Sequence, residues 1–147
     1  MGTLSTKNPA PAASAPAPAR SASNSAGAPR QTLEQQRSHN AWTVSARYGK
    51  DHVNAAKGLP ALIMNSGLMQ VLAFCHEKGK AQGDVAGDLR AWLAGQFRQT
   101  FQRGSDFAPF MEALMEADPA TYQAVNAEAF AWLKWLRQMA AARKPGE

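Results

Sequence analysis

The side chains in this sequence that could carry out chemistry are few, and their spacing keeps them apart. Cys75 and His76 are adjacent, so on a helix they point about 100° apart and cannot ligate one metal ion together. His39 and His52 are well separated within one expected helix, which leaves each without a second ligand nearby. We therefore expect no metal site and no cofactor.

Two carboxylates have a spacing that could imitate an acid/base pair. Glu112 and Glu116 stand at i and i+4, but this is also the spacing of the solvated face of an amphipathic helix. The sequence contains no Gly-rich phosphate loop, no H-E-x-x-H and no C-x-x-C. Cys75 lies on an apolar stripe, where a cysteine is typically a small core residue. We predict that the protein is not an enzyme.

The overall charge makes a polyanion a plausible partner. The 147 residues carry 16 Lys+Arg and 11 Asp+Glu, a formal charge of +5. Many proteins without such a partner are equally basic. One cysteine excludes an internal disulfide, and the first residues lack the pattern of a secretory signal. We expect a cytoplasmic protein.

The first 30 residues differ in composition from the rest. They contain nine Ala, five Pro and five Ser, with no aromatic and no acidic residue. Such a segment cannot bury enough apolar surface to fold, so residues 1–30 are expected to form a disordered tail. It is either a tether or an electrostatic contact to nucleic acid. The chain beyond it keeps 13 basic and 11 acidic residues, and residues 31–144 are expected to form one compact domain.

The apolar spacing between residues 31 and 144 is helical throughout. Thr32 and Gln35 form a capping-box start for a long first helix that continues to about Val53. Pro60 is expected to open a short second helix, and residues 65–67, Asn-Ser-Gly, to end it.

Four more helices follow, with boundaries marked by caps and glycines. The third covers about residues 68–78 and ends at Gly79. Asp84 is expected to cap the fourth, and apolar residues from Phe107 to Met115 mark the fifth. Asp118 with the following proline opens the long last helix. The prediction is an all-α domain of about six helices, the first and last of them long.

The longest uncharged stretch, LPALIMNSGLMQVLAFC, runs from Leu59 to Cys75. A membrane-spanning helix needs about 20 continuous apolar residues. This stretch is shorter and is interrupted by Asn65, Ser66 and Gly67. We therefore assign most of it to the core of two packed helices.

Three blocks of the sequence resemble a known family. They are GLPALIMNSGLMQVLAFCHEKG, LEQQRSHNAW near the start of the domain, and YQAVNAEAFAWLKWLRQMAAA in its last helix. In order and spacing they are similar to the small helical subunit of the type III-B (Cmr) CRISPR effector complex. The likeness covers residues 33–142, with departures at Met64, Ser66 and Lys134.

This resemblance implies a non-catalytic subunit in antiviral defence. Several copies would stack as a minor filament along the duplex of guide RNA and target RNA, contact the larger Cmr subunits and help to hold the target strand. Two alternatives stay open. The chain could be the small subunit of another multi-subunit CRISPR complex, or a stand-alone helical interaction module without a nucleic-acid role.

Arg37 is the first candidate for an RNA contact, because it falls between Leu33 and Ala41 on an apolar stripe. A guanidinium there needs a partner, either an internal carboxylate or a phosphate. Arg90 and Arg98 are expected on one side of the fourth helix. The full set of RNA candidates is Arg37, Lys50, Lys57, Arg90, Arg98 and Arg137. The candidates for subunit interfaces are Trp42, Val53 and Trp135.

Overall fold

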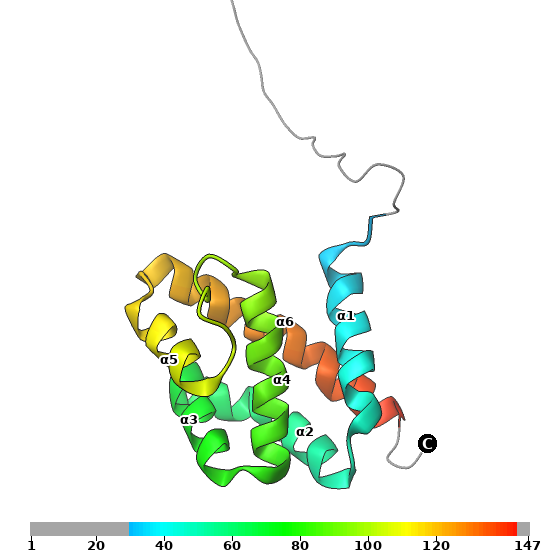
Figure 1. Cartoon of the computed structure of the whole chain (residues 1–147). Coiled ribbons are helices and arrows are strands. Elements are labelled where there is room, and N and C mark those ends of the chain that lie inside the picture. The colour runs from blue at the N-terminus through cyan, green and yellow to red at the C-terminus, as the bar shows by residue number, and fades with distance from the viewer. Residues whose placement is uncertain (1–29, 144–147) are drawn as a thin grey trace, which may run out of the picture. The chain divides into compact units, whose positions relative to one another are not determined.

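The computed structural model describes residues 30–143, and every regular element among them is a helix. These residues form six α-helices (Figure 1) and one short 3₁₀ helix, η4. Their bounds are α1 Leu33–Val44, η4 Ser45–Arg47, α2 Lys50–Ser66, α3 Leu68–Lys78, α4 Lys80–Gln96, α5 Phe107–Glu116 and α6 Pro119–Arg143. The predicted all-α class with about six helices is confirmed. The expected tail lies outside the described residues except for Arg30, so its boundary with the domain stays a prediction.

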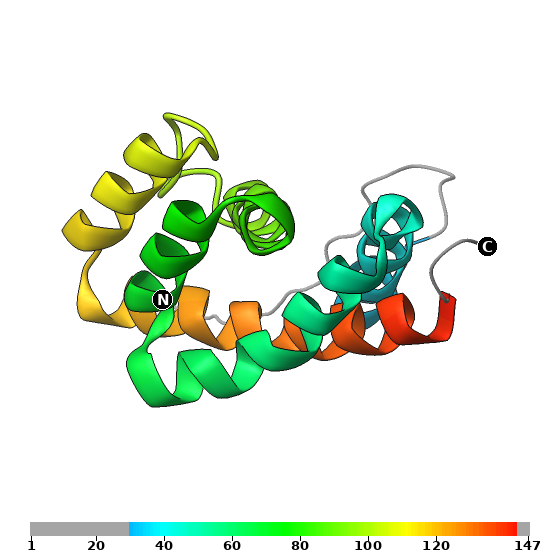
Figure 2. The same ribbon diagram turned by 90° about the horizontal axis from the view of Figure 1, so that it is seen from below.

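Helix α6 is the element on which the others assemble. It has 25 residues, and α1, η4, α2 and α4 all pack against it. In Figure 1 it passes behind α4 and α1, and the view from below in Figure 2 shows α2 lying along it. One side of α6 is buried, as the apolar spacing predicted. The buried apolar residues are Val125, Ala129, Trp132, Leu133, Leu136 and Ala140.

The long first helix expected from the sequence is two helices in the structure. Helix α1 ends at Val44, and α2 begins at Lys50. The side chain of Tyr48, between them, is buried and donates its hydroxyl hydrogen to Oδ2 of Asp88 at 2.8 Å. His52 accepts the N–H of Gly49 on Nδ1 at 3.1 Å and so closes the first turn of α2. The anchored tyrosine makes the chain turn where apolar spacing alone predicted continuity.

Pro60 does not open a helix, contrary to the prediction. It lies inside α2, which continues to Ser66. Its ring removes one backbone hydrogen bond and ordinarily costs a helix interior about 3 kcal/mol. The helix persists because Ala56, Leu59 and Ile63 on its inner face are buried in the core, and α2 packs on both α4 and α6. Tertiary packing here outweighs the local preference.

The uncharged stretch from residue 59 to 75 supplies core and surface in alternation. Its inner residues are buried, namely Leu59, Ile63, Leu68, Val71, Leu72 and Cys75. Leu62, Met64 and Phe74 remain 41%, 77% and 43% exposed. The assignment of most of the stretch to the core therefore holds for one side of α2 and α3 only. Among the described residues, none of the helices combines the length and the hydrophobicity that a membrane span requires.

Three other expected helix boundaries can be compared with the structure. Asp84 is not a cap, because α4 already begins at Lys80. Gly79 ends α3 with a φ of 65°, and the chain re-enters a helix directly after it. Asp118 does cap α6, since its Oδ1 accepts the N–H of Thr121 at 2.7 Å. This hydrogen bond holds the pKa of Asp118 below its ordinary value.

Gly67 joins α2 to α3 in a backbone conformation that side chains rarely adopt, with φ 86° and ψ 157°. No atom lies near the position that a Cβ would take, so Gly67→Ala isolates the backbone strain. We expect a loss of about 1–3 kcal/mol in the free energy of unfolding, measured by urea denaturation. Gly58→Ala is the matched control, since Gly58 lies inside α2 with open space around it. It should stabilise by up to about 1 kcal/mol. Equal effects of Gly67→Ala and Gly58→Ala on the free energy of unfolding would show that the backbone of Gly67 does not require a glycine.

Candidate RNA interface

Polar contacts dock α1 onto the domain. Ala41 is the only buried residue of this helix, so apolar burial contributes little. Arg37 instead donates from Nε and Nη2 to the two carboxylate oxygens of Glu128, both at 2.7 Å. Asn40 accepts the indole N–H of Trp132 on Oδ1 at 2.8 Å. Both partners lie near the middle of α6, so these contacts hold α1 against that helix.

The carboxylate of Glu128 connects three helices. The residue is only 8% exposed. Besides Arg37 on α1, it binds Trp92 on α4, whose Nε1–H donates to Oε2 at 3.0 Å. The ring of Trp92 stacks on that of Trp132, with centroids 6.5 Å apart. A buried carboxylate with these three hydrogen bonds is well satisfied, whereas an unpaired one would be costly.

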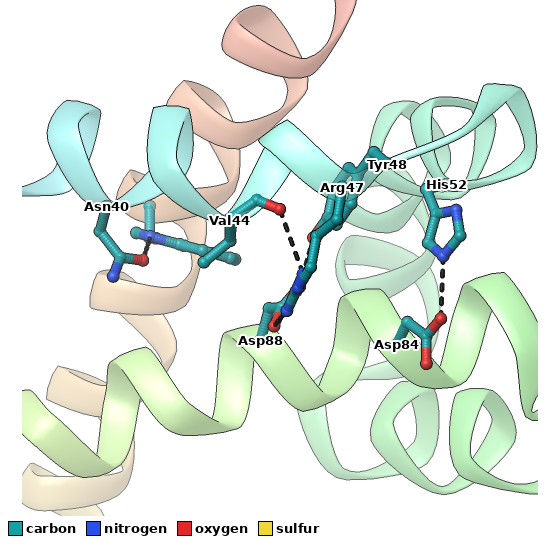
Figure 3. Close-up of polar contacts among 8 residues, drawn as sticks. Asn40, Val44, Arg47, Tyr48, His52, Asp84 and Asp88 are labelled. Atoms are coloured by element: carbon teal, nitrogen blue, oxygen red, sulfur yellow. Dashed lines mark hydrogen bonds and ion pairs between the residues drawn. The ribbon is translucent and has the colours of Figure 1, made fainter. Parts of the chain in front are cut away.

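The C-terminal end of α1 is held by two further arginines. Its last carbonyl groups have no partner within the helix. Arg143 donates from Nη2 to the carbonyl of Trp42 at 3.2 Å, and Arg47 donates from Nη1 to the carbonyl of Val44 at the same distance. Arg47 also pairs with Asp88 at 2.6 Å, as Figure 3 shows. Positive charge at this helix end favours the helix dipole.

A polar cluster next to this end fixes the start of α2. Figure 3 shows His52 of α2 beside Asp84 of α4, with Nε2 and Oδ2 2.9 Å apart. Because Nδ1 accepts from Gly49, Nε2 carries the hydrogen and donates it to Asp84. Burial raises the pKa of Asp88, and burial together with the nearby Asp88 charge raises the pKa of Tyr48. Tyr48 therefore remains a hydrogen-bond donor at physiological pH.

Arg37 has the internal carboxylate that was one of its two expected partners. Glu128 raises the pKa of Arg37 through the hydrogen bonds and the opposite charge. With its side chain only 20% exposed, Arg37 serves the packing of α1. A direct contact of Arg37 with phosphate would have to compete with this bidentate pair, so we leave it out of the proposed interface.

The other basic candidates lie in different surroundings. Lys50, Lys57 and Arg137 are exposed. Arg90 is half-buried and donates from Nε to the carbonyl of Ser105 at 2.9 Å. Burial lowers its pKa. Arg98 is exposed but follows the end of α4 at Gln96, so the expected placement of Arg90 and Arg98 on one side of a helix is wrong.

The three candidates for subunit interfaces differ in their exposure. Trp42 is 44% exposed and carries Arg143 over its ring, with Cζ 3.6 Å from the centroid. Val53 is buried in the core of its own chain, and Trp135 is half-buried against that core. Trp42 is therefore the one of the three with a substantial free surface.

Acidic residues are unevenly distributed along the chain, which the net charge of the whole chain does not show. Residues 35–50 and 129–143 contain no acidic residue. They comprise α1 from residue 35 onward, η4, the chain up to Lys50 at the start of α2, and the C-terminal part of α6. We call these residues together the basic end. Its basic residues are Arg37, Arg47, Lys50, Lys134, Arg137 and Arg143. Arg37 and Arg47 are paired with carboxylates, while the other four form no ion pair among the described residues.

The structure has a shallow groove with exposed apolar side chains, which the sequence did not predict. It has a volume of about 440 Å³, lies between α2, α3 and the start of α4, and includes the exposed Leu62 and Phe74 in its lining. The sequence predicted that most of the stretch from residue 59 to 75 is core and did not single out Leu62 as a surface residue. The position of Leu62 on α2 could be assigned to the surface only once the helix was known to continue through Pro60.

The side chains that could carry out chemistry by their type make structural contacts instead. Burial raises the pKa of Cys75, which lies in the core. The ring of His76 stacks on Phe107 with centroids 3.9 Å apart. Glu112 and Glu116 both face Arg103, at 3.3 and 3.4 Å. Within residues 30–143 no three His, Cys, Asp or Glu side chains are grouped to hold a metal ion.

The network predicts strong coupling between Arg37 and Glu128. Arg37→Met should lower the free energy of unfolding by about 2–4 kcal/mol, because a buried carboxylate loses its cation. Adding Glu128→Gln should restore much of this loss, since a neutral amide still accepts from Trp92. Urea unfolding of the full chain measures both. Additive effects of the two substitutions would show that the pair is not what docks α1.

Comparison with known proteins agrees with this architecture. The family model for "CRISPR-associated protein (Cas_Cmr5)" matches residues 33–143. A similar solved structure is the crystal structure of a CRISPR-associated Cmr5 family protein from Thermus thermophilus. It has a TM-score of 0.63 and 26% sequence identity, over 78% of this chain and 99% of that chain. No curated protein sequence matches. The chain therefore belongs to the Cas_Cmr5 family, which confirms the predicted resemblance to the small subunit of the type III-B (Cmr) CRISPR complex.

Proposed function

We propose that this protein is a non-catalytic subunit that helps to hold target RNA in a type III-B effector complex. Several copies stack along the duplex of guide and target RNA, and the basic end of each copy lies toward the RNA backbone. Cleavage of the target belongs to other subunits. The expected location is the cytoplasm, where the complex acts in antiviral defence.

The observation that carries this proposal is the segregation of charge. Lys50, Lys134, Arg137 and Arg143 belong to segments without a carboxylate and form no ion pair among the described residues. Elsewhere in the domain, Arg103 faces two glutamates, and residues 104–128 contain five acidic residues and no basic one. A phosphate approaching the basic end meets uncompensated positive charge, and counterion release from RNA then favours binding.

The groove with Leu62 and Phe74 is the surface that we assign to a larger Cmr subunit. Exposed apolar side chains beside a concave surface are typical of protein contacts. This groove is lined by α2, α3 and the start of α4, and none of its lining residues belongs to the basic end. One subunit can then bind protein and RNA through different surfaces.

A matched pair of charge-removing variants tests the proposal in the assembled complex. Lys134→Ala/Arg137→Ala removes two exposed cations from the basic end. It should weaken retention of target RNA and reduce the slope of log affinity against log salt by roughly 1–1.5, as expected for the loss of about two phosphate contacts. Lys78→Ala/Arg98→Ala removes two exposed cations outside the basic end and should leave affinity and slope nearly unchanged. Filter binding across a salt series measures both.

Incorporation into the complex and melting temperature must match the wild type for the comparison to count. The assignment of the basic end would be wrong if the control pair had the larger effect on RNA retention. Failure of the wild-type chain to co-purify with a ribonucleoprotein containing guide RNA would instead favour a stand-alone interaction module.

A further inference from the structure

Trp42 and Arg143 form a preassembled stack at the surface of the basic end. The guanidinium carbon of Arg143 lies 3.6 Å from the centroid of the indole ring, the distance of close cation–π stacking. Nη2 of the same arginine donates to the carbonyl of Trp42. The arginine thus covers one side of the ring, and the tryptophan still remains 44% exposed.

The backbone that carries the indole ring is held before any ligand arrives. The carbonyl of Trp42 also accepts the hydroxyl of Ser45 at 3.1 Å, so the last turn of α1 is held from two directions. The helix itself is anchored by Arg37 and Glu128. A large exposed aromatic side chain in a rigid setting loses little entropy when it binds.

The surroundings favour a nucleobase over an apolar protein surface. On the outer face of α1, the turn before Trp42 carries Ser38 and His39, and no exposed large apolar side chain. The nearest acidic residue on this helix is Glu34, two turns away. Arg143 forms no ion pair among the described residues, so the stack keeps its positive charge. A planar base can stack on the indole while its phosphates meet this charge.

We propose that Trp42, backed by Arg143, is a stacking platform for one unpaired base of single-stranded RNA. This inference rests on the proposed RNA role of the basic end. It adds a stacking contact to a base to the contacts with phosphates. It predicts binding without sequence preference, because every base offers a π face. It also predicts a preference for unpaired over duplex RNA.

The test uses the full chain at low salt with two probes, decauridylate and an abasic oligoribose phosphate of equal length. Trp42→Leu keeps apolar bulk beneath Arg143 but removes the aromatic face. It should weaken decauridylate binding about tenfold and leave binding of the abasic probe unchanged. Trp42→Phe should stay within about threefold of the wild type, because a smaller π face remains. Fluorescence anisotropy of labelled probes gives the affinities.

Phe74→Ala is the matched control. Phe74 is similarly exposed at 43%, and Lys78 lies over its ring at 5.6 Å, but it lies in the apolar groove. It should leave both affinities unchanged. The platform is refuted if Trp42→Leu weakens both probes equally, weakens neither, or impairs only incorporation into the Cmr complex, which would assign Trp42 to a protein contact. Loss of binding in Lys134→Ala/Arg137→Ala tests the proposed phosphate contacts separately, with either probe.

Discussion

The carboxylate of Glu128 is the group on which the arrangement of this domain depends. It is buried on α6 and receives hydrogen bonds from Arg37 on α1 and Trp92 on α4. Burying the charge is unfavourable without these donors, and α1 has almost no apolar surface with which to pack. The charge of Glu128 and the position of α1 therefore require each other. Because α1 carries Trp42, the same buried pair also positions the aromatic side chain that we assign to RNA.

The assignment of functions follows from how the charges are distributed. Pairing Arg37 and Arg47 with carboxylates orders the backbone around the end of α1, while Lys134, Arg137 and Arg143 on the last turns of α6 have no such partner among the described residues. The basic end thus contains two kinds of cation. Those paired with carboxylates stabilise the fold, and those without such a partner among the described residues can bind phosphate. A weak contact of this kind becomes effective when several copies present it along one RNA strand, since linked sites raise the effective concentration.

The sequence predicted the fold class because the helical apolar spacing of α3, α5 and α6 agrees with their local caps, as at Gly79 and Asp118. It failed where tertiary contacts outweigh local signals. Pro60 is carried inside α2 by buried neighbours, and the turn at Tyr48 depends on a hydrogen bond to Asp88 on another helix. Arg37 was recognised as needing a partner, but Glu128 is 91 residues away. No local pattern could choose between that carboxylate and a phosphate.

We expect the basic end to face target RNA in the assembled complex. Photo-crosslinking of a target strand substituted with 4-thiouridine, followed by mass spectrometry of the crosslinked peptides, identifies the residues that lie next to the RNA. We predict crosslinks in peptides from residues 35–50 and 129–143, including one at Trp42. Crosslinks confined to peptides from α3, α4 or α5, such as those containing Lys78 or Arg98, would contradict the account.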